Sequence, residues 1–262
     1  MTAQQIPEPL EIDWPGQGIN PFKLLRYPTL ASTNTEAAVL LQNKLIPPPF
    51  IVFTNHQTAG RGRGTNTWVS TNGVLTVTFV VTSDHLRLPQ YVPLLAGLAI
   101  RDACVSLGAK PVGLKWPNDV LANGLKVAGL LCERVYGGDL IGVGANVSNH
   151  LRDLPTSIAR RSTTISTLAG REVSTSEAIQ AFTKSIASYF IEPKQTLEQA
   201  MESYSNHLAM KGRKIRVSDP GLVKSIDNVE GYCDGVDDSG RLVVTNSLGR
   251  HVIMSGSVKI LD

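Results

Sequence analysis

The sequence has few of the features that mark secreted, zinc-binding or membrane proteins. Its three cysteines, Cys104, Cys132 and Cys233, are far apart and form no CxxC pair, which argues against a disulfide framework or a zinc site and favours a reducing compartment. The N-terminal stretch MTAQQIPEPLEIDWPGQG lacks the basic segment and apolar run of a secretion signal. No apolar stretch is long enough to span a bilayer. We therefore expect a cytoplasmic protein with no membrane partner.

The chain also lacks a strong excess of charge. Lys and Arg number 25 against 22 Asp and Glu, which gives a net charge of +3 at pH 7. Proteins dedicated to nucleic acid usually show a basic stripe or face, so we expect no nucleic-acid partner. The 262 residues are 42% hydrophobic, enough for a substantial core in one large domain or in one domain with a small appendage.

Strands and helices are predicted to alternate irregularly before residue 210. Residues 1–20 are rich in proline, glycine and acidic side chains, which is typical of an irregular arm. Runs rich in β-branched and other apolar residues predict strands at 22–27, 50–53, 74–82, 112–116, 126–135 and 140–147. Helical spacing or capping-box patterns, such as Thr33 with Glu36 and Ser174 with Glu177, predict helices at 34–42, 90–107, 174–191 and 196–208.

The composition changes after Gly212. Short β-prone runs (KIRV, RLVVTN, HVIM and SVKIL) alternate with polar turns such as Asp237-Asp238-Ser239-Gly240. This spacing predicts a small barrel of about five strands. We therefore divide the chain into an arm at 1–20, a main domain at 21–210 and a small β domain at 211–262.

The segment Gly60-Arg61-Gly62-Arg63-Gly64, followed by Trp68, has the composition of a ligand-binding loop. Glycine lets the main chain approach a ligand closely, and arginine presents a fixed fork of donors that suits carboxylate and phosphate oxygens. Trp68 adds a flat face for a ring. The alternative for such a short motif, taken alone, is a solvated basic loop.

A second candidate site follows in Lys115-Trp116-Pro117-Asn118-Asp119 and Lys126. Pro-Asn-Asp is turn chemistry, so this segment alone could simply connect two strands. Lys126, however, opens an apolar strand, where a buried ammonium group requires a partner charge or a bound anion. The alternative to an anion is an ion pair with Asp119 or Glu133.

Two further polar segments belong with these motifs. Ser32, Thr33 and Asn34 begin the first predicted helix, where free N–H groups and hydroxyls can receive a ligand's carbonyl or carboxylate. Gln57 lies just before the Gly/Arg segment. The run GVGANV at 142–147 ends a strand and lacks the third glycine of GxGxxG, which excludes a dinucleotide fingerprint. Asn146 in that run could cap a turn beside a ligand.

Four motifs follow one another along the chain: STN at 32–34, QTAGRGRG…W at 57–68, KWPNDV…KVAGLL at 115–131 and GVGANV at 142–147. Their order and spacing resemble those of the biotin protein ligase family. The resemblance covers residues 22–149 and is weaker in the C-terminal part. It implies an α+β fold with a central mixed β-sheet flanked by helices, as in class II aminoacyl-tRNA synthetases. It also implies an SH3-like C-terminal barrel and no N-terminal DNA-binding domain.

The resemblance further implies an activity. Members of the family couple biotin to ATP, forming biotinyl-5′-AMP and pyrophosphate, and pass the biotinyl group to a lysine of a carrier domain. The expected substrates are therefore ATP, accompanied by Mg²⁺, and biotin. The expected partner is the biotin carboxyl carrier domain of a biotin-dependent carboxylase. The chain itself is expected to be a monomer or a homodimer.

The same resemblance assigns roles to the motif residues. It implies that Lys126, Arg63 and Arg61 are catalytic and that Asp119 orients Lys126 or a metal ion. The histidines show no metal-ligand spacing, so we predict no metal site built by the protein alone. The implied biotin-binding residues are Ser32, Thr33, Asn34, Gln57, Gly60, Arg61, Gly62, Arg63, Lys126 and Gly129. The implied ATP- and adenylate-binding residues are Arg61, Arg63, Trp68, Asn118, Asp119, Lys126 and Asn146, with Trp68 against the adenine.

The chain departs from the family pattern within the Gly/Arg segment. That segment often reads GRGRRGRxW in the family, whereas here it reads GRGRGTNTW, so that Gly64 and Asn66 stand where arginines are common. We therefore hypothesise that this chain releases the adenylate more readily than members with the fuller loop. The alternatives are a lipoate–protein ligase, which lacks the combination of GRGRG with KWPND, and a non-catalytic module that binds RNA or protein.

Overall fold

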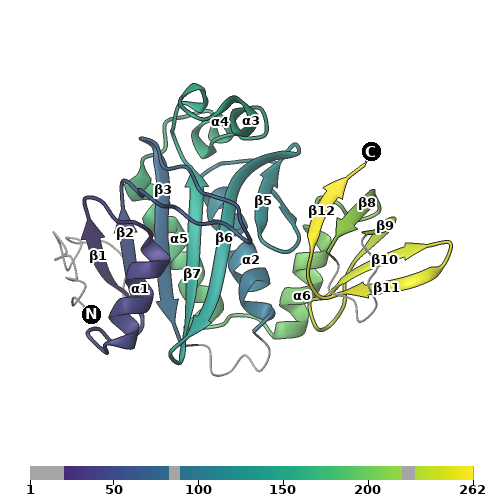
Figure 1. Cartoon of the computed structure of the whole chain (residues 1–262), viewed down its shortest axis with the longest axis horizontal. Helices are drawn as coiled ribbons and strands as arrows, with labels where there is room; N and C mark the ends of the chain where they lie inside the picture. Colours follow the sequence, from purple (N-terminus) through teal and green to yellow (C-terminus); the bar gives the residue numbers. More distant parts are fainter. Residues whose placement is uncertain (1–20, 83–88, 220–227, 262) are drawn as a thin grey trace.

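The computed structural model describes residues 21–82, 89–219 and 228–261, and these form two β-sheets with helices packed around them (Figure 1). The larger sheet has seven strands in the order β1-β2-β3-β7-β6-β5-β4, and the smaller has five in the order β11-β10-β9-β8-β12. In the part of the chain that is described, no helix combines the length and the apolar character required to cross a bilayer.

The larger sheet is mixed, as predicted. Strands β1 and β2 pair in parallel, and every other neighbouring pair is antiparallel. Its strands are β1 (Lys23–Tyr27), β2 (Phe50–Thr54), β3 (Val74–Val81), β7 (Gly138–Asn146), β6 (Leu125–Val135), β5 (Asp119–Ala122) and β4 (Gly113–Lys115).

Helices cover both faces of this sheet. Helix α1 (Thr33–Gln42) packs on β2, β3 and β7, while α2 (Tyr91–Ser106) and α5 (Thr175–Phe190) pack on the opposite face. Alternate residues of β2 therefore enter two different cores: Phe50 and Val52 face α1, whereas Ile51 and Phe53 face the main core. A strand that is buried on both faces needs apolar residues at every position, which explains the continuous apolar run of β2.

A β-bulge in β6 reorients the side chains around Lys126. Val120 pairs with Ala128 but Leu121 pairs with Lys126, so Val127 is an extra residue on β6. Val127 and Ala128 both enter the main core, although adjacent residues of a regular strand face opposite sides. Lys126 is thereby turned toward the same face as Gly129, which places its ammonium group over the surface of the sheet.

The C-terminal sheet is antiparallel and fits a small barrel-like unit. It comprises β8 (Lys214–Ser218), β9 (Asn228–Val236), β10 (Leu242–Asn246), β11 (Gly249–Ile253) and β12 (Ser257–Ile260). The turn between β9 and β10 is tied to the main body: the Trp116 indole N–H donates to the Gly240 carbonyl at 3.1 Å, and the Tyr91 hydroxyl donates to the Asp238 carbonyl at 2.8 Å. The two sheets consequently share one continuous hydrophobic core.

Most predicted elements are present, but several were missed. Helix α5, with its capping box at Ser174 and Glu177, and α6 (Leu197–Asn206) confirm two predicted helices. The elements without a predicted counterpart are β5, β9, a 3₁₀ turn at Leu151–Asp153, α3 (Thr156–Ala159) and α4 (Ile165–Ala169). The chain passes from α6 to β8 across the boundary proposed at 210 and 211, and the predicted arm at 1–20 lies outside the described residues.

The predicted capping box at the start of α1 is wrong. Ser32, not Thr33, is the N-cap residue, and its side chain makes no capping hydrogen bond. The Glu36 carboxylate instead accepts a hydrogen bond from the Tyr27 hydroxyl at 3.4 Å. The polar side chains of the first turn are therefore available for contacts outside the helix.

This difference predicts unequal stability effects for two serines at helix N-caps. Replacing Ser174 by alanine removes a bond in which the serine hydroxyl accepts from the Glu177 N–H at 3.1 Å, and should lower the free energy of unfolding by about 1 kcal/mol. Ser32→Ala is the matched control, since it removes no such bond and should cost less than the Ser174 variant. Urea unfolding measures both, and equal losses would contradict the capping assignment.

Candidate functional site

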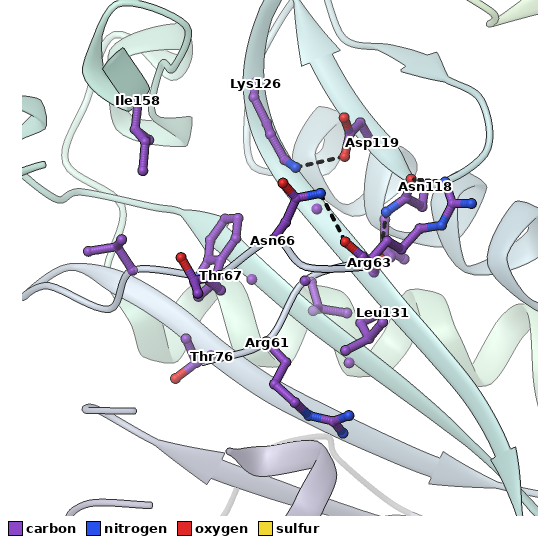
Figure 2. A pocket seen from close by; sticks show the side chains of 18 of the residues that line it. Arg61, Arg63, Asn66, Thr67, Thr76, Asn118, Asp119, Lys126, Leu131 and Ile158 are labelled. Carbon is purple, nitrogen blue, oxygen red and sulfur yellow. Dashed lines mark hydrogen bonds and ion pairs between the residues drawn. The ribbon is translucent and has the colours of Figure 1, made fainter. Parts of the chain in front are cut away.

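A cavity of about 610 Å³ lies where the four motifs meet (Figure 2). It is bounded by the start of α1, the Gly/Arg loop at residues 60–68, strands β6 and β7, the α3 segment and the start of β12. All the predicted site residues except Gly60 line it: Ser32, Thr33, Asn34, Gln57, Arg61, Gly62, Arg63, Trp68, Asn118, Asp119, Lys126, Gly129 and Asn146. The structure thus brings together residues more than 100 positions apart in the sequence.

Gly60 contributes to the shape of the loop rather than to the cavity wall. Its carbonyl accepts a hydrogen bond from the Trp68 N–H at 2.9 Å, and a Cβ at this position would collide with the Trp68 carbonyl oxygen. At the tip, the Asn66 amide donates to the Arg63 carbonyl at 2.9 Å, and Gly64 has a φ of +62°. The loop is therefore closed on itself by internal hydrogen bonds.

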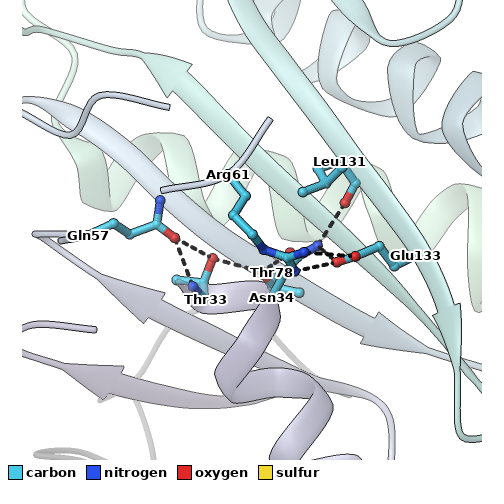
Figure 3. A network of polar contacts seen from close by, with 7 residues as sticks. All are labelled: Thr33, Asn34, Gln57, Arg61, Thr78, Leu131 and Glu133. Carbon is cyan, nitrogen blue, oxygen red and sulfur yellow. Dashed lines mark hydrogen bonds and ion pairs between the residues drawn. The ribbon is translucent and has the colours of Figure 1, made fainter. Parts of the chain in front are cut away.

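At the α1 end of the cavity, a hydrogen-bond network fixes the polar side chains of the STN motif (Figure 3). The backbone N–H and the hydroxyl of Thr33 donate to the Gln57 side-chain oxygen at 2.8 and 3.2 Å. The Asn34 amide donates to the Leu131 carbonyl at 3.0 Å and to the Glu133 carboxylate at 2.7 Å, while its oxygen accepts from the Thr78 hydroxyl at 2.6 Å. These hydrogen bonds restrict the conformations of the side chains that line this end of the cavity.

Arg61 closes the same network. Its two terminal nitrogens donate to the two oxygens of Glu133 at 3.2 and 2.9 Å, a bidentate geometry (Figure 3). The sequence had singled out Glu133 only as a possible partner of Lys126. The structure instead places Glu133 between Arg61 and Asn34, where it fixes both, and the charge of Arg61 is balanced within the protein.

Lys126 and Arg63 lie on the other side of the loop (Figure 2). The Lys126 ammonium is 2.7 Å from the Asp119 carboxylate, one of the two ion pairs considered from the sequence. Arg63 donates to the Asn118 side-chain oxygen and to the Gly256 carbonyl, both at 3.3 Å. Arg63 is therefore positioned by neutral acceptors and keeps its full positive charge available to a ligand.

Asn118 and Asn146 line the cavity and also brace its framework. The Asn118 amide donates to the Leu130 carbonyl at 2.8 Å, and the Asn146 amide donates to the Lys126 carbonyl at 3.3 Å. Each asparagine therefore links strands or loops next to the charged residues. They hold the backbone around Lys126 and Arg63 in place.

Trp68 lies in a hollow that two glycines create in the sheet. Gly129 on β6 and Gly144 on β7 are direct cross-strand partners, and a Cβ on Gly144 would collide with the indole ring. The Lys126 ammonium lies 5.7 Å from the centre of the same ring, within cation–π range. The buried indole N–H finds no acceptor among the described residues, so it is free to donate to a ligand.

The cavity also contains cationic residues that sequence reasoning did not assign. Lys115 and Arg161 both line it. Burial lowers the pKa of the Lys115 ammonium; Asp119 opposes this shift, and the positive charges of Lys126 and Arg161 add to it. Lys115 is the first residue of the KWPND motif, whereas Arg161 belongs to a segment that carries no recognisable pattern.

Tertiary pairing brings the α3 segment to the site. The Lys126 N–H donates to the Arg161 carbonyl at 2.7 Å, and the Thr163 N–H donates to the Lys126 carbonyl at 3.0 Å. Other lining residues that the sequence did not reveal are Thr76, Ser157, Ile158, Ser162, Ser257 and Val258. Local sequence gave no signal for them, since they arrive through contacts between distant segments.

The chemistry of the lining favours electrostatic over covalent catalysis. Within the described ranges, Asp119 is the only carboxylate in the lining, and neither histidine nor cysteine is present there. Burial raises the pKa of all three thiols, which disfavours a thiolate nucleophile. Residues 21–82, 89–219 and 228–261 contain no group of three His, Cys, Asp or Glu side chains placed to hold a metal ion. The cavity is suited to binding anions beside polar and aromatic groups.

Comparison with known proteins agrees with these features. The model of the Biotin/lipoate A/B protein ligase family matches residues 27–148. A biotin–[acetyl-CoA-carboxylase] ligase of Mycobacterium tuberculosis is 31% identical over 78% of this chain and 76% of its own length. The bifunctional ligase/repressor BirA of Bacillus subtilis is 27% identical over 90% of this chain and 74% of its own.

A solved structure has the same fold. The biotin protein ligase from Aquifex aeolicus in complex with biotin and ATP superimposes with a TM-score of 0.78 at 23% sequence identity. The match covers 91% of this chain and 99% of that one. It includes both sheets, which confirms the predicted central mixed sheet with flanking helices and a small C-terminal β unit.

The hollow under Trp68 leads to a prediction. A methyl group added by Gly144→Ala would collide with the indole ring of Trp68. Because β7, which carries Gly144, is paired on both sides within the sheet, the collision should force Trp68 outward. Acrylamide quenching of tryptophan fluorescence should then increase. Gly97→Ala, in α2, is the control, since its Cβ would meet side chains only at 3.5 Å or more.

A second variant, Gly144→Ala combined with Trp68→Phe, separates movement of Trp68 from a general loosening of the fold. Without Trp68, the increase in quenching should disappear. An increase that persists would show that Trp68 is not the residue displaced.

Proposed function

This chain belongs to the biotin protein ligase family and acts as a biotin ligase with biotin and ATP as substrates, and we propose that it makes biotinyl-5′-AMP and then biotinylates a carrier protein. In the first step, a biotin carboxylate oxygen attacks the α-phosphorus of ATP, and pyrophosphate leaves with the electron pair of the broken P–O bond. In the second step, a lysine amine of a biotin carboxyl carrier domain attacks the acyl carbon. The amine loses a proton and AMP leaves.

The observation that carries this proposal is that a fixed polar network and a cluster of cations share one cavity. Two anionic reactants must approach each other in the first step, and their repulsion raises the barrier. Cations placed beforehand around both groups offset this repulsion and stabilise the charge that develops on the phosphoryl oxygens. Arg63 and Lys126 lie on the cavity wall where they can perform this role.

Biotin fits the end of the cavity at α1. Its ureido ring requires donors and acceptors in fixed positions, which the network of Thr33, Asn34 and Gln57 supplies. The Ser32 hydroxyl lines the same end. We assign the biotin-binding role to these residues, to Arg61 and Gly62 of the loop, and to Gly129, whose missing side chain leaves room next to Lys126. Gly60 acts indirectly, by setting the shape of the loop.

Lys126 lies between the two ends of the cavity. Its contact with Asp119 fixes the ammonium, and its position beside Trp68 keeps it over the sheet surface. We propose that Lys126 bridges the biotin carboxylate and the α-phosphate, that Asn118 and Asn146 hold the surrounding backbone, and that Trp68 shields the reacting groups from water. Shielding matters because the mixed anhydride hydrolyses when it is exposed.

The cavity is compatible with Mg²⁺ carried by ATP. This ion is usually held by one or two carboxylates together with phosphate oxygens and water, and Asp119 supplies one carboxylate in the lining. The ion would neutralise part of the triphosphate charge when bound. Asp119 would then serve both the ion and Lys126.

The central prediction concerns Lys126. Lys126→Met keeps most of the length of the side chain but removes the charge, and should lower biotin-dependent ATP–pyrophosphate exchange by at least about 100-fold. Lys184→Met, an exposed position on α5, is the matched control and should keep full activity. Normal exchange in the Lys126 variant would refute the catalytic assignment.

Three further measurements separate the proposed function from its alternatives and test its second step. Exchange supported by lipoate but not by biotin would indicate a lipoate ligase. Transfer of labelled biotin to a purified carrier domain tests the second step, and salt-sensitive RNA binding without ATP turnover would indicate a binding module instead.

The loop tip yields a second prediction. Gly64 has open space around its Cβ position but a φ of +62°, so Gly64→Arg should cost about 1 kcal/mol of backbone strain. The added guanidinium should slow adenylate dissociation by a factor of about 3 to 10. Asn66 is left unchanged, since its amide holds the Arg63 carbonyl.

Gly64→Ala is the control for this variant, because it introduces the same strain without the charge. Dissociation of labelled biotinyl-5′-AMP from the three proteins measures the effect. Identical rates for the arginine and alanine variants would show that the missing arginine does not determine how long the adenylate stays bound.

A further inference from the structure

The cationic side chains that line the cavity fall into two groups. Arg61 and Lys126 each contact a carboxylate, Glu133 at 2.9 Å and Asp119 at 2.7 Å. Arg63, Lys115 and Arg161 also line the cavity, but none of the three makes an ion pair with a carboxylate in the described ranges. The unbalanced positive charge therefore lies on the side of the loop away from Glu133, where Lys126 and Asn118 are found.

Arg161 differs from the other two because it comes from a segment outside the motifs. It follows α3, and its main chain is fixed at Lys126: the Arg161 carbonyl accepts from the Lys126 N–H at 2.7 Å, and the chain returns so that the Thr163 N–H donates to the Lys126 carbonyl at 3.0 Å. The backbone of Arg161 is thus anchored directly beside the central cation of the site. Arg161 is exposed and lines the cavity.

An exposed arginine is ordinarily a solvated surface residue. Arg160, the residue before Arg161, is an example of this ordinary case. Arg160 is also exposed but does not line the cavity. Burial lowers the pKa of the Lys115 ammonium, Asp119 opposes this shift, and the charges of Lys126 and Arg161 add to it. In the free protein these cations therefore repel one another, and a bound polyanion would relieve that repulsion.

We propose that Arg161 binds the β- and γ-phosphates of ATP and so stabilises pyrophosphate as the leaving group. This inference rests on the proposed function, since it assigns a residue to the same reaction. Lys126 lies between the biotin end and the unbalanced cations and suits the α-phosphate, which leaves the terminal phosphates for the cations on the side away from Glu133, Arg161 among them. When the bond between the α-phosphorus and the bridging oxygen breaks, negative charge grows on the departing pyrophosphate, and a guanidinium there lowers the barrier.

The test compares nucleotide binding by Arg161→Ala and Arg160→Ala in the full chain. Isothermal titration with ATP and with AMP should show that Arg161→Ala binds ATP about tenfold more weakly, while its affinity for AMP changes less than about twofold. Inhibition by inorganic pyrophosphate should weaken by a similar factor. Arg160→Ala should match the unaltered protein in all three measurements, and Arg161→Lys should recover part of the ATP affinity.

Three outcomes would overturn the inference. Equal weakening for ATP and AMP would place Arg161 at the α-phosphate or the nucleoside, unchanged ATP affinity would leave it without a role in binding, and equal losses in the two alanine variants would indicate a general effect of surface charge. Failure of the proposed function is distinguishable from all three, because the unaltered protein would then show no biotin-dependent exchange. Thermal unfolding of each variant shows whether a loss of binding reflects a loss of fold.

Discussion

The Lys126 ammonium lies 2.7 Å from Asp119, over a strand whose neighbouring residues enter the main core. A charge in this position is tolerated only because three structural features support it. The bulge at Val127 turns the side chain away from the core, Asp119 supplies the opposite charge, and the absence of a side chain at Gly129 leaves room for the ammonium group. The same bulge leaves the Lys126 backbone open to pairing with residues 161–163, so the position of the charge also determines where the α3 segment joins the site.

The two ends of the cavity differ in whether their positive charges are balanced by carboxylates of the protein. At the α1 end, Glu133 neutralises Arg61, and the remaining polar groups hydrogen-bond to one another or to the backbone. Such an end suits a largely neutral ring system. On the other side of the loop, cations outnumber Asp119, the one carboxylate that the described residues contribute to the lining, which suits a polyphosphate. Lys126 lies between the two, where we propose that the biotin carboxylate meets the α-phosphate of ATP.

The sequence predicted those parts of the structure whose cause is local. The run FIVF becomes β2 because both of its faces are buried, and Ser174 and Glu177 form their capping box because the interaction needs only four consecutive residues. Strand β9 was missed because two glycines and alternating polar residues weaken its hydrophobic pattern, and β5 because Pro-Asn-Asp suggested only a turn. Motif residues were found by type and spacing, yet neither the Arg61–Glu133 pair nor the α3 segment could be, since both depend on how distant segments pack.

The C-terminal sheet contributes residues to the candidate site. The Gly256 carbonyl accepts a hydrogen bond from Arg63, and Ser257 and Val258 at the start of β12 line the cavity. The hydrogen bonds from Trp116 and Tyr91 to the β9–β10 turn help to hold this sheet, and with it these residues, in place. Trp116 is itself part of the KWPND motif, so a single short segment both supplies Asn118 and Asp119 to the cavity and anchors the sheet that positions Arg63. A change that loosens this anchor would therefore alter the charge distribution in the cavity without touching any residue that contacts a substrate.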